Sequence, residues 1–312
     1  MAAAATPLGL AGLDSLLGQG GALPPSGGDR RYRWIVRAYI LLQLCASALA
    51  AALVAGPTTG LIAASGLALS AGVTTGVFGF VAAHELIHGR SARDRALGLL
   101  LLGSVFYMHF RIAHVYGHHR RAATFEDPAT ARLGEGLYSF LGRSIAGQFR
   151  EAWMFEKKRQ QSAGHAIIAP RNRMVAYVAI ETGLLLAVAS VSVRAALFLL
   201  GTALVAVTLL ESFNYVAHYG LRRGLGRDGR PERLAAEHSW NSARRMNNAA
   251  LFNMGRHSDH HRRTTRPYEQ LQPLPGAAQL PSGYAAALLT ALIPPLWRRT
   301  MDPLVASLRP HR

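Results

Sequence analysis

The sequence predicts an all-α integral membrane protein made of two transmembrane helical hairpins, short re-entrant or interfacial helices, and a cytosolic, histidine-rich, metal-binding cap. Three observations carry this prediction. Half of the 312 residues are hydrophobic and only 16% are charged, which is apolar for a soluble protein. The apolar residues lie in long uncharged runs, as in membrane-spanning helices. Nine of the 13 histidines fall into four short groups.

Four apolar runs are long enough, at about 20 residues each, to cross a bilayer. They cover about residues 34–55, 59–83, 174–193 and 195–213. Short joints connect them in pairs, so each pair is predicted to form a helical hairpin. Arg194 is the only one of the 34 Lys and Arg residues on one side of this topology. Because basic residues gather on the cytosolic side, we expect the termini and both long polar segments in the cytosol.

Two further apolar pieces, residues 96–110 and 284–296, are too short to cross a bilayer. We expect them to be re-entrant or interfacial helices, the second ended or bent by Pro294 and Pro295. Residues 1–33 are rich in Ala, Gly and Pro, and no basic residue precedes Arg30, so a secretory signal is not expected. We predict a disordered cytosolic tail over residues 1–33 and a single domain over residues 34–312.

The single cysteine and the net charge narrow the function. Cys45 lies inside the first apolar run, so a disulfide, a fused rubredoxin and an iron–sulfur cluster are excluded, because each needs more than one thiolate. The net charge of +17 fits a basic cytosolic face. Nucleic-acid binding is the alternative, but no motif for it accompanies the charge.

The four histidine groups carry the chemistry. Histidines four residues apart project from one face of a helix, as predicted for His84 with His88 and for His114 with His118. Imidazole suits Fe, Zn, Cu and Ni, and nine imidazoles are too many for one ion, so two metals are implied. Two of the groups directly follow apolar runs, so all four can meet at one membrane–cytosol boundary. The groups are His84 with His88; His114, His118 and His119; His218; and His257, His260 and His261.

Competing metal proteins explain less of this pattern. Residues 84–88 match the H-E-x-x-H motif of zinc proteases, with Glu85 as the base. A membrane zinc protease needs only one further ligand and leaves the other seven grouped histidines without a role. A metal transporter is expected to carry histidines or carboxylates deep within its spans, and these spans are nearly free of them.

These motifs resemble those of the bacterial alkane hydroxylases and xylene monooxygenases, a branch of the membrane fatty acid desaturase and hydroxylase group. The resemblance covers about residues 75–305. The matching segments are residues 84–88, 117–119 with 123–128, 214–220, 238–241, 256–261 and 280–299.

The resemblance implies two non-haem irons, activation of O₂, and insertion of one oxygen atom into a C–H bond of a hydrophobic substrate such as an n-alkane or an alkyl or acyl chain. It also implies electrons from a rubredoxin or ferredoxin-type carrier with its NAD(P)H reductase, and a bacterial inner membrane with the metal site on the cytosolic side. A lipid desaturase with the same iron site is the alternative. The implied iron ligands are His84, His88, His114, His118, His119, His218, His257, His260 and His261.

The chain departs from the family pattern in three ways. Family members usually carry a carboxylate just before the histidines of the second and third groups, where this chain has Ala113 and Ala217. Glu211, two helical turns before His218, is a candidate to compensate. Members also often have six spans, against four here. Partners expected to orient the ligand histidines are Glu85, Asp259, His238, Asn241 and Glu211.

Two further features have competing interpretations. Glu181 lies within the third predicted span, where a charge is costly and often functional; a quiet pairing with a neighbour is the alternative. Small residues such as Gly66 and Gly72 leave room for a substrate chain or simply let helices pack.

The basic pairs near the histidines are predicted to dock an acidic electron carrier. The alternative is that they enforce topology or contact anionic lipid headgroups. The predicted docking residues are Arg222, Arg223, Arg262 and Arg263.

Overall fold

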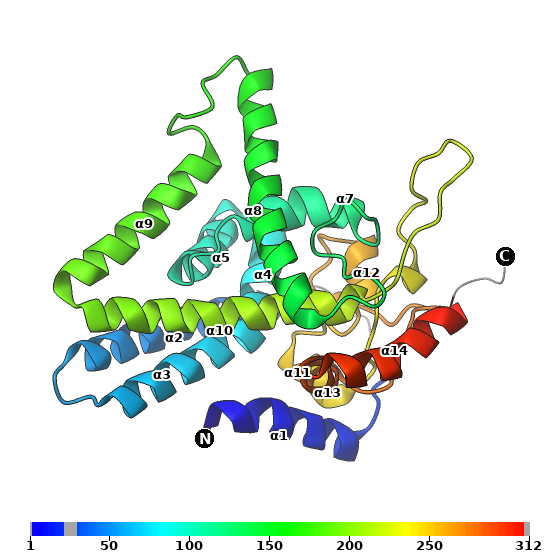
Figure 1. Cartoon of the computed structure of the whole chain (residues 1–312), viewed down its shortest axis with the longest axis horizontal. Coiled ribbons are helices and arrows are strands. Elements are labelled where there is room, and N and C mark those ends of the chain that lie inside the picture. Colours follow the sequence, from blue (N-terminus) through cyan, green and yellow to red (C-terminus); the bar gives the residue numbers. More distant parts are fainter. Residues whose placement is uncertain (1, 22–29, 309–312) are drawn as a thin grey trace. The chain divides into compact units, whose positions relative to one another are not determined.

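The computed structural model describes residues 2–21 and 30–308 (Figure 1). Apart from isolated β-bridges, the regular secondary structure of these residues is helical, as predicted. The chain divides into two compact units. Unit 1 comprises chiefly residues 30–117 and 148–210, and unit 2 chiefly residues 118–147 and 211–312 with the N-terminal segment. The single domain predicted for residues 34–312 stays a prediction, because compactness does not show that a unit folds alone.

The long apolar helices confirm the four predicted spans. Within the described residues, four helices are long and apolar enough to cross a membrane: Arg31–Ala55, Leu61–His88, Arg173–Val191 and Val193–His218. Unit 1 contains, wholly or in part, α2 (Arg30–Ala55), α3 (Leu61–Thr74), the π-helix η1 (Thr75–Gly79), α4 (Phe80–His88), α5 (Ala92–Ser104), α6 (Phe110–Ile112), the π-helix η2 (Ala113–His118), α8 (Leu137–Ser162), α9 (Arg173–Val191) and α10 (Val193–His218).

Glycines let α3 and η1 pack closely on α10. A Cβ on Gly72 would lie 2.5 Å from the Cβ of Val205, and one on Gly76 would lie 2.8 Å from the Cβ of Leu209. Both separations are too short for real carbon atoms, so only glycine fits there. Close approach at small residues is how membrane helices commonly associate. Gly72 therefore packs two helices and leaves no room for a substrate chain, whereas Gly66 borders open space.

The apolar piece at residues 96–110 forms a helical hairpin within unit 1. Helix α5 ends at Ser104, the chain turns back through residues 105–109, and α6 continues into η2. The turn is buried at Val105, Tyr107, Met108 and His109. Irregular backbone at membrane depth is tolerated where protein surrounds it, so this form suits the predicted re-entrant segment.

Unit 2 packs short helices around buried aromatic residues. The indole N–H of Trp240 donates to the carbonyl oxygen of Tyr219 at 2.9 Å, and the hydroxyl of Tyr284 donates to that of Trp240 at 2.6 Å. Helix α13 ends before Pro294, which begins α14, because proline is favoured in a first helical turn. Besides parts of α8 and α10, the elements are α1 (Ala2–Leu17), α7 (His119–Arg121), the 3₁₀ helix η3 (Ala236–His238), α11 (Arg245–Ala250), α12 (His257–Arg262), the 3₁₀ helix η4 (Tyr268–Gln270), α13 (Tyr284–Ala291) and α14 (Pro294–Leu308).

Helix α1 occupies part of the segment that the sequence predicted to be a disordered tail. Its buried Asp14 carboxylate accepts the backbone N–H of Asn247 at 2.8 Å. Arg244 also donates to the carbonyl oxygen of Asp14. These contacts within unit 2 give the segment a fixed place that composition alone does not reveal. Residues 22–29 of the predicted tail lie outside the described residues.

Candidate metal centre

Four histidines of unit 2 converge on one point. His118, His218, His257 and His261 each offer one ring nitrogen, and these four atoms lie within 4.8 Å of one another. The Nε2 atom of His257 lies 3.0 Å from that of His218 and 3.1 Å from that of His261. All four side chains are buried. Nitrogens about 2.1 Å from a shared ion lie about 3 to 4 Å apart, so this four-histidine group fits one metal ion.

Three different elements supply the four-histidine group. His118 ends η2, His218 ends α10, and His257 and His261 lie one turn apart on α12. Burial, followed by the neighbouring histidines, lowers the pKa of His261 well below its usual value. Its imidazole is therefore neutral near pH 7, which is the form that binds a metal.

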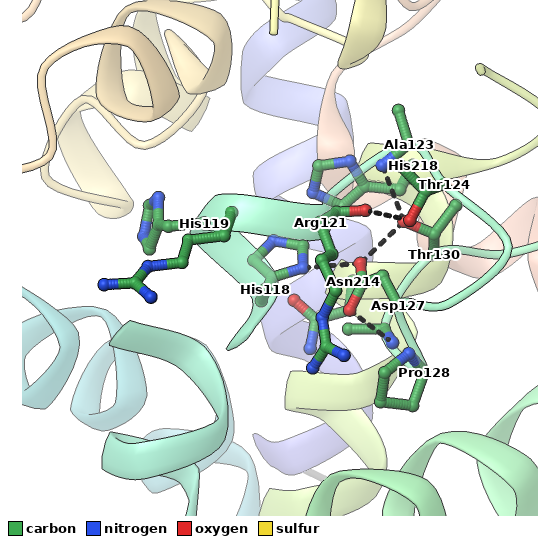
Figure 2. Close-up of polar contacts among 12 residues, drawn as sticks. His118, His119, Arg121, Ala123, Thr124, Asp127, Pro128, Thr130, Asn214 and His218 are labelled. Carbon is green, nitrogen blue, oxygen red and sulfur yellow. Dashed lines mark hydrogen bonds and ion pairs between the residues drawn. The ribbon is translucent and has the colours of Figure 1, made fainter. Parts of the chain in front are cut away.

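Asp127 orients one member of this group, and sequence reasoning did not assign it a role. Its Oδ2 atom accepts a hydrogen bond from Nδ1 of His118 at 2.8 Å, as Figure 2 shows, and both side chains are buried. The hydroxyl of Thr130 donates to the same oxygen at 2.6 Å, and the N–H of Ala129 donates to Oδ1 at 3.1 Å. Because Nδ1 of His118 carries the donated proton, its Nε2 lone pair is left for a metal.

The carboxyl group of Asp127 is held in its ionised form. Burial would raise its pKa, but the charge and hydrogen bond of His118 and the hydroxyl of Thr130 outweigh burial, so the pKa lies below its usual value. Thr130 in turn accepts the N–H of Ala123 at 2.9 Å, and Ala123 has a φ of 61°. This left-handed turn brings the carboxylate back to His118 nine residues after it. The only sequence signal was the matching segment 123–128.

Three histidines of unit 1 form a second gathering. His84 and His88 lie one turn apart on α4, as their spacing predicts, with ring centroids 4.6 Å apart. The Nε2 atom of His114 lies 2.8 Å from that of His84. The ring centroids of His88 and His114 are 5.2 Å apart. The remaining two histidines, His119 and His260, form a pair in unit 2 with their Nε2 atoms 3.1 Å apart.

The predicted geometry of His114 and His118 is wrong. The sequence placed both on one helical face, but His114 joins His84 and His88, whereas His118 belongs to the four-histidine group. The cause is η2, whose π-helical i→i+5 bonds put more residues into each turn than an α-helix has. Single π-helical turns are frequent at functional sites, and η1 likewise precedes the α4 histidines.

Asn241 and His238 hold the polypeptide around α12. The carboxamide oxygen of Asn241 accepts the N–H of Ser258 at 3.0 Å, and its Nδ2 atom donates to the Ser258 hydroxyl at 2.7 Å. Asn241 thereby fixes the residue that follows His257. Nδ1 of His238 accepts the N–H of Ala235 at 2.9 Å, and burial lowers the pKa of His238.

The contacts of the predicted carboxylate partners differ from expectation. Asp259 accepts hydrogen bonds from Arg266 at 2.8 Å and from the N–H of Gln272 at 2.9 Å, so these bonds tie α12 to the following loop. Glu211 is buried and accepts from the Ser144 hydroxyl at 2.6 Å. Glu85 is half-buried beside His84 on α4. Their predicted roles toward the histidines stay predictions.

The two predicted docking pairs differ in exposure. The guanidinium carbon of Arg222 lies 3.0 Å from the centre of the Phe125 ring. Arg223 donates to the carbonyl oxygen of Arg120 at 2.7 Å, so it holds loop backbone. Arg262 and Arg263, at the end of α12, are exposed. The second pair is therefore the more accessible docking surface.

The comparisons with known proteins agree with the resemblance. Residues 60–286 match the fatty acid desaturase family. The chain is 44% identical over 243 residues to alkane 1-monooxygenase 1 of Pseudomonas aeruginosa, an alignment of 78% of this chain and 64% of that protein. It is 36% identical over 297 residues to the alkane 1-monooxygenase of Acinetobacter baylyi, covering 93% of this chain and 72% of that protein. It is 30% identical over 236 residues to the xylene/toluene monooxygenase hydroxylase component of Pseudomonas putida, covering 75% and 62%.

The extent of these matches decides the family. The chain spans just under two thirds of the Pseudomonas aeruginosa protein and more than two thirds of the Acinetobacter baylyi protein. The family match extends from the start of α3 to α13 and includes all nine grouped histidines. The chain therefore belongs to the fatty acid desaturase family and, within it, to the alkane 1-monooxygenase group.

Proposed function

We propose that this chain is a membrane-bound, non-haem di-iron monooxygenase that hydroxylates a C–H bond of a hydrophobic substrate, either an n-alkane or an alkyl or acyl chain. Its membership among alkane 1-monooxygenases supports the reaction class. The single observation that carries the proposal is the buried convergence of four imidazole nitrogens in unit 2.

The proposal assigns nine histidines to two irons. The four-histidine group holds one iron, and the other five grouped histidines are the ligands of the second. When bound, the iron pair activates O₂, and one oxygen atom enters the substrate while the other leaves as water, which consumes two electrons and two protons. The donor set fits iron because imidazole is one of its usual protein ligands.

The chain's own residues prepare this site. Asp127 accepts the Nδ1 proton of His118 and keeps its Nε2 atom available. Asn241 fixes the backbone between His257 and Asp259. Burial of the four-histidine group excludes water, and a dry site suppresses competing reactions of a reactive oxidant. The apolar helices of unit 1 give a lipid-soluble substrate access from the bilayer.

The proposed location is the bacterial inner membrane, with the metal centre on the cytosolic side. A sequence with one cysteine cannot hold its own iron–sulfur cluster or rubredoxin centre. Electrons therefore come from a separate rubredoxin or ferredoxin-type carrier with an NAD(P)H reductase. The exposed Arg262 and Arg263 would attract an acidic carrier and orient it.

Desaturation is the second candidate, because the matching family model is that of the fatty acid desaturases. The same histidines would serve, and the product would lose two hydrogen atoms instead of gaining oxygen. The zinc protease interpretation of residues 84–88 has less support, since the four-histidine group is not part of that motif.

The test is product analysis with heavy-isotope O₂. Purified chain is supplied with carrier, reductase and a panel of n-alkanes and fatty acyl chains. We expect an alcohol that contains one labelled oxygen atom. An alkene without added oxygen would establish the desaturase, and hydrolysis of peptides by a zinc-loaded protein would establish the protease. His257→Ala should abolish the product, and Glu126→Gln, an exposed change near Asp127, should retain it.

A further inference from the structure

Glu181 lies within α9, a helix long and apolar enough to span the membrane, and its Oε1 atom accepts the backbone N–H of Met108 at 2.7 Å. We propose that Glu181 is a positioning residue for the metal centre. It fixes the turn at residues 105–109 and, through that turn, the imidazole of His114. The inference rests on the proposed function, because it takes His114 as a metal ligand.

The turn needs an outside partner. Phe106 has a φ of 54°, and a residue other than glycine in this region stores about 1–3 kcal/mol of strain. The N–H of Tyr107 is paired with the carbonyl oxygen of Leu102 at 2.9 Å. The N–H of Met108 is paired with Glu181. Met108 is buried, and a buried N–H without an acceptor costs about 1–3 kcal/mol. Glu181 therefore stabilises this turn against rearrangement.

The same face of α9 also contacts the helix that follows the turn. Tyr177 lies one helical turn before Glu181, and its hydroxyl accepts a hydrogen bond from Nη1 of Arg111 at 3.3 Å. Arg111 belongs to α6, which continues directly into η2. Two polar contacts from one helix face thus define where α6 begins.

Aromatic stacking carries this position to the ligand. The Phe110 ring stacks on the His114 ring, with centroids 4.7 Å apart and an interplanar angle of 23°. Tyr107 stacks on Phe110 at 6.1 Å, and both rings meet the edge of Phe80, which lies on the histidine-bearing α4. The rings of Phe80, Tyr107 and Phe110 are buried. Ligand distances in metal sites are held to about 0.2 Å, so displacement of the turn must weaken the metal bound by His114.

A carboxylate in this place has a cost that its hydrogen bond must justify. Insertion scales assign a charged residue at the centre of a membrane helix about 2.5–3.5 kcal/mol. An apolar residue would avoid that cost but could not accept the Met108 N–H. Glutamine would supply the same carbonyl oxygen without a formal charge. The proposal therefore predicts that glutamine replaces Glu181 and that leucine does not.

The test measures metal binding directly, with Co²⁺ as the probe, by titrating the metal-free protein and following visible absorption. We expect Glu181→Leu to weaken one of two binding steps by about tenfold or more, the scale of outer ligand-sphere changes. Glu181→Gln should bind as the wild type does. Thr182→Leu, an exposed change at the next residue of α9, is the matched control and should also bind normally.

A second variant covers the case in which Glu181→Leu does not fold. Glu181→Asp keeps the charge but withdraws the carboxylate by one carbon, so we expect it to weaken the same binding step. Equal Co²⁺ affinity in wild type, leucine and aspartate variants would overturn the proposal. Weak binding by the glutamine variant would overturn it too, because charge and not the acceptor would then matter. A wild-type protein that binds no Co²⁺ would instead overturn the proposed metal centre itself.

Discussion

Replacing Asp127 by asparagine tests how the four-histidine group is held. Asp127 accepts three hydrogen bonds, from Nδ1 of His118, the Thr130 hydroxyl and the Ala129 N–H. Asparagine has one acceptor oxygen and no charge, so His118 loses its anionic partner. Such partners are worth about 10–100-fold in metal affinity, which corresponds to about 1.4–2.8 kcal/mol. We therefore expect one of the two metal ions to be bound more weakly by that factor.

The assay is a competition titration with a chelator, in which the iron that remains on the protein is measured. Glu126→Gln is the matched control, because Glu126 is an exposed carboxylate at the preceding position. It should release iron as the wild type does. Helix content should be the same in all three proteins. An Asp127→Asn protein that retains both irons with wild-type affinity would refute the role given to this carboxylate.

Three further predictions use other parts of the structure. Burial lowers the pKa of His109 to about 4. Its neutrality therefore stabilises the fold fully above pH of about 6.5, and the metal-free wild type should lose about 2 kcal/mol more than His109→Gln between pH of about 7 and about 5. Charge reversal at Arg262 and Arg263 should raise the apparent carrier KM several-fold and leave iron content unchanged. Gly72→Ala should destabilise the protein by about 1–3 kcal/mol through overpacking, whereas Gly66→Ala should not.

Each of these predictions has a direct check. Chemical unfolding of both proteins across the pH range tests His109, and parallel curves would contradict its assignment. Turnover at limiting carrier tests the docking pair, with Arg230→Glu in an exposed loop as the control; an unchanged KM would leave Arg262 and Arg263 without that role. Thermal unfolding in detergent tests the glycines, and equal effects of the two alanine changes would show that Gly72 is not tightly packed.

The sequence predicts the membrane helices well because their signal is local. Uncharged runs of the right length located all four spans, yet α10 continues to His218, beyond the predicted end at residue 213. Hydropathy cannot detect that extension, because the last turns of α10 carry polar residues that are buried in unit 2, such as Asn214. The pairing of His84 and His88 was equally predictable, since it needs only an α-helix.

What the sequence could not predict depends on tertiary packing and backbone detail. The π-helix η2 separates His114 from His118, and no local residue pattern announces i→i+5 bonding. Asp127 reaches His118 only through a loop in which Ala123 adopts a left-handed conformation. Composition predicted disorder near the N-terminus, but it could not reveal that Asp14 would find a buried partner in α11.

The central claim is that the grouped histidines hold two irons, and metal analysis of the purified wild-type protein tests it most directly. Chain concentration from amino-acid analysis and metals from mass spectrometry give the stoichiometry in one experiment. We expect about two irons per chain, because nine imidazoles exceed what one ion can bind. One zinc ion per chain with no iron would contradict the account.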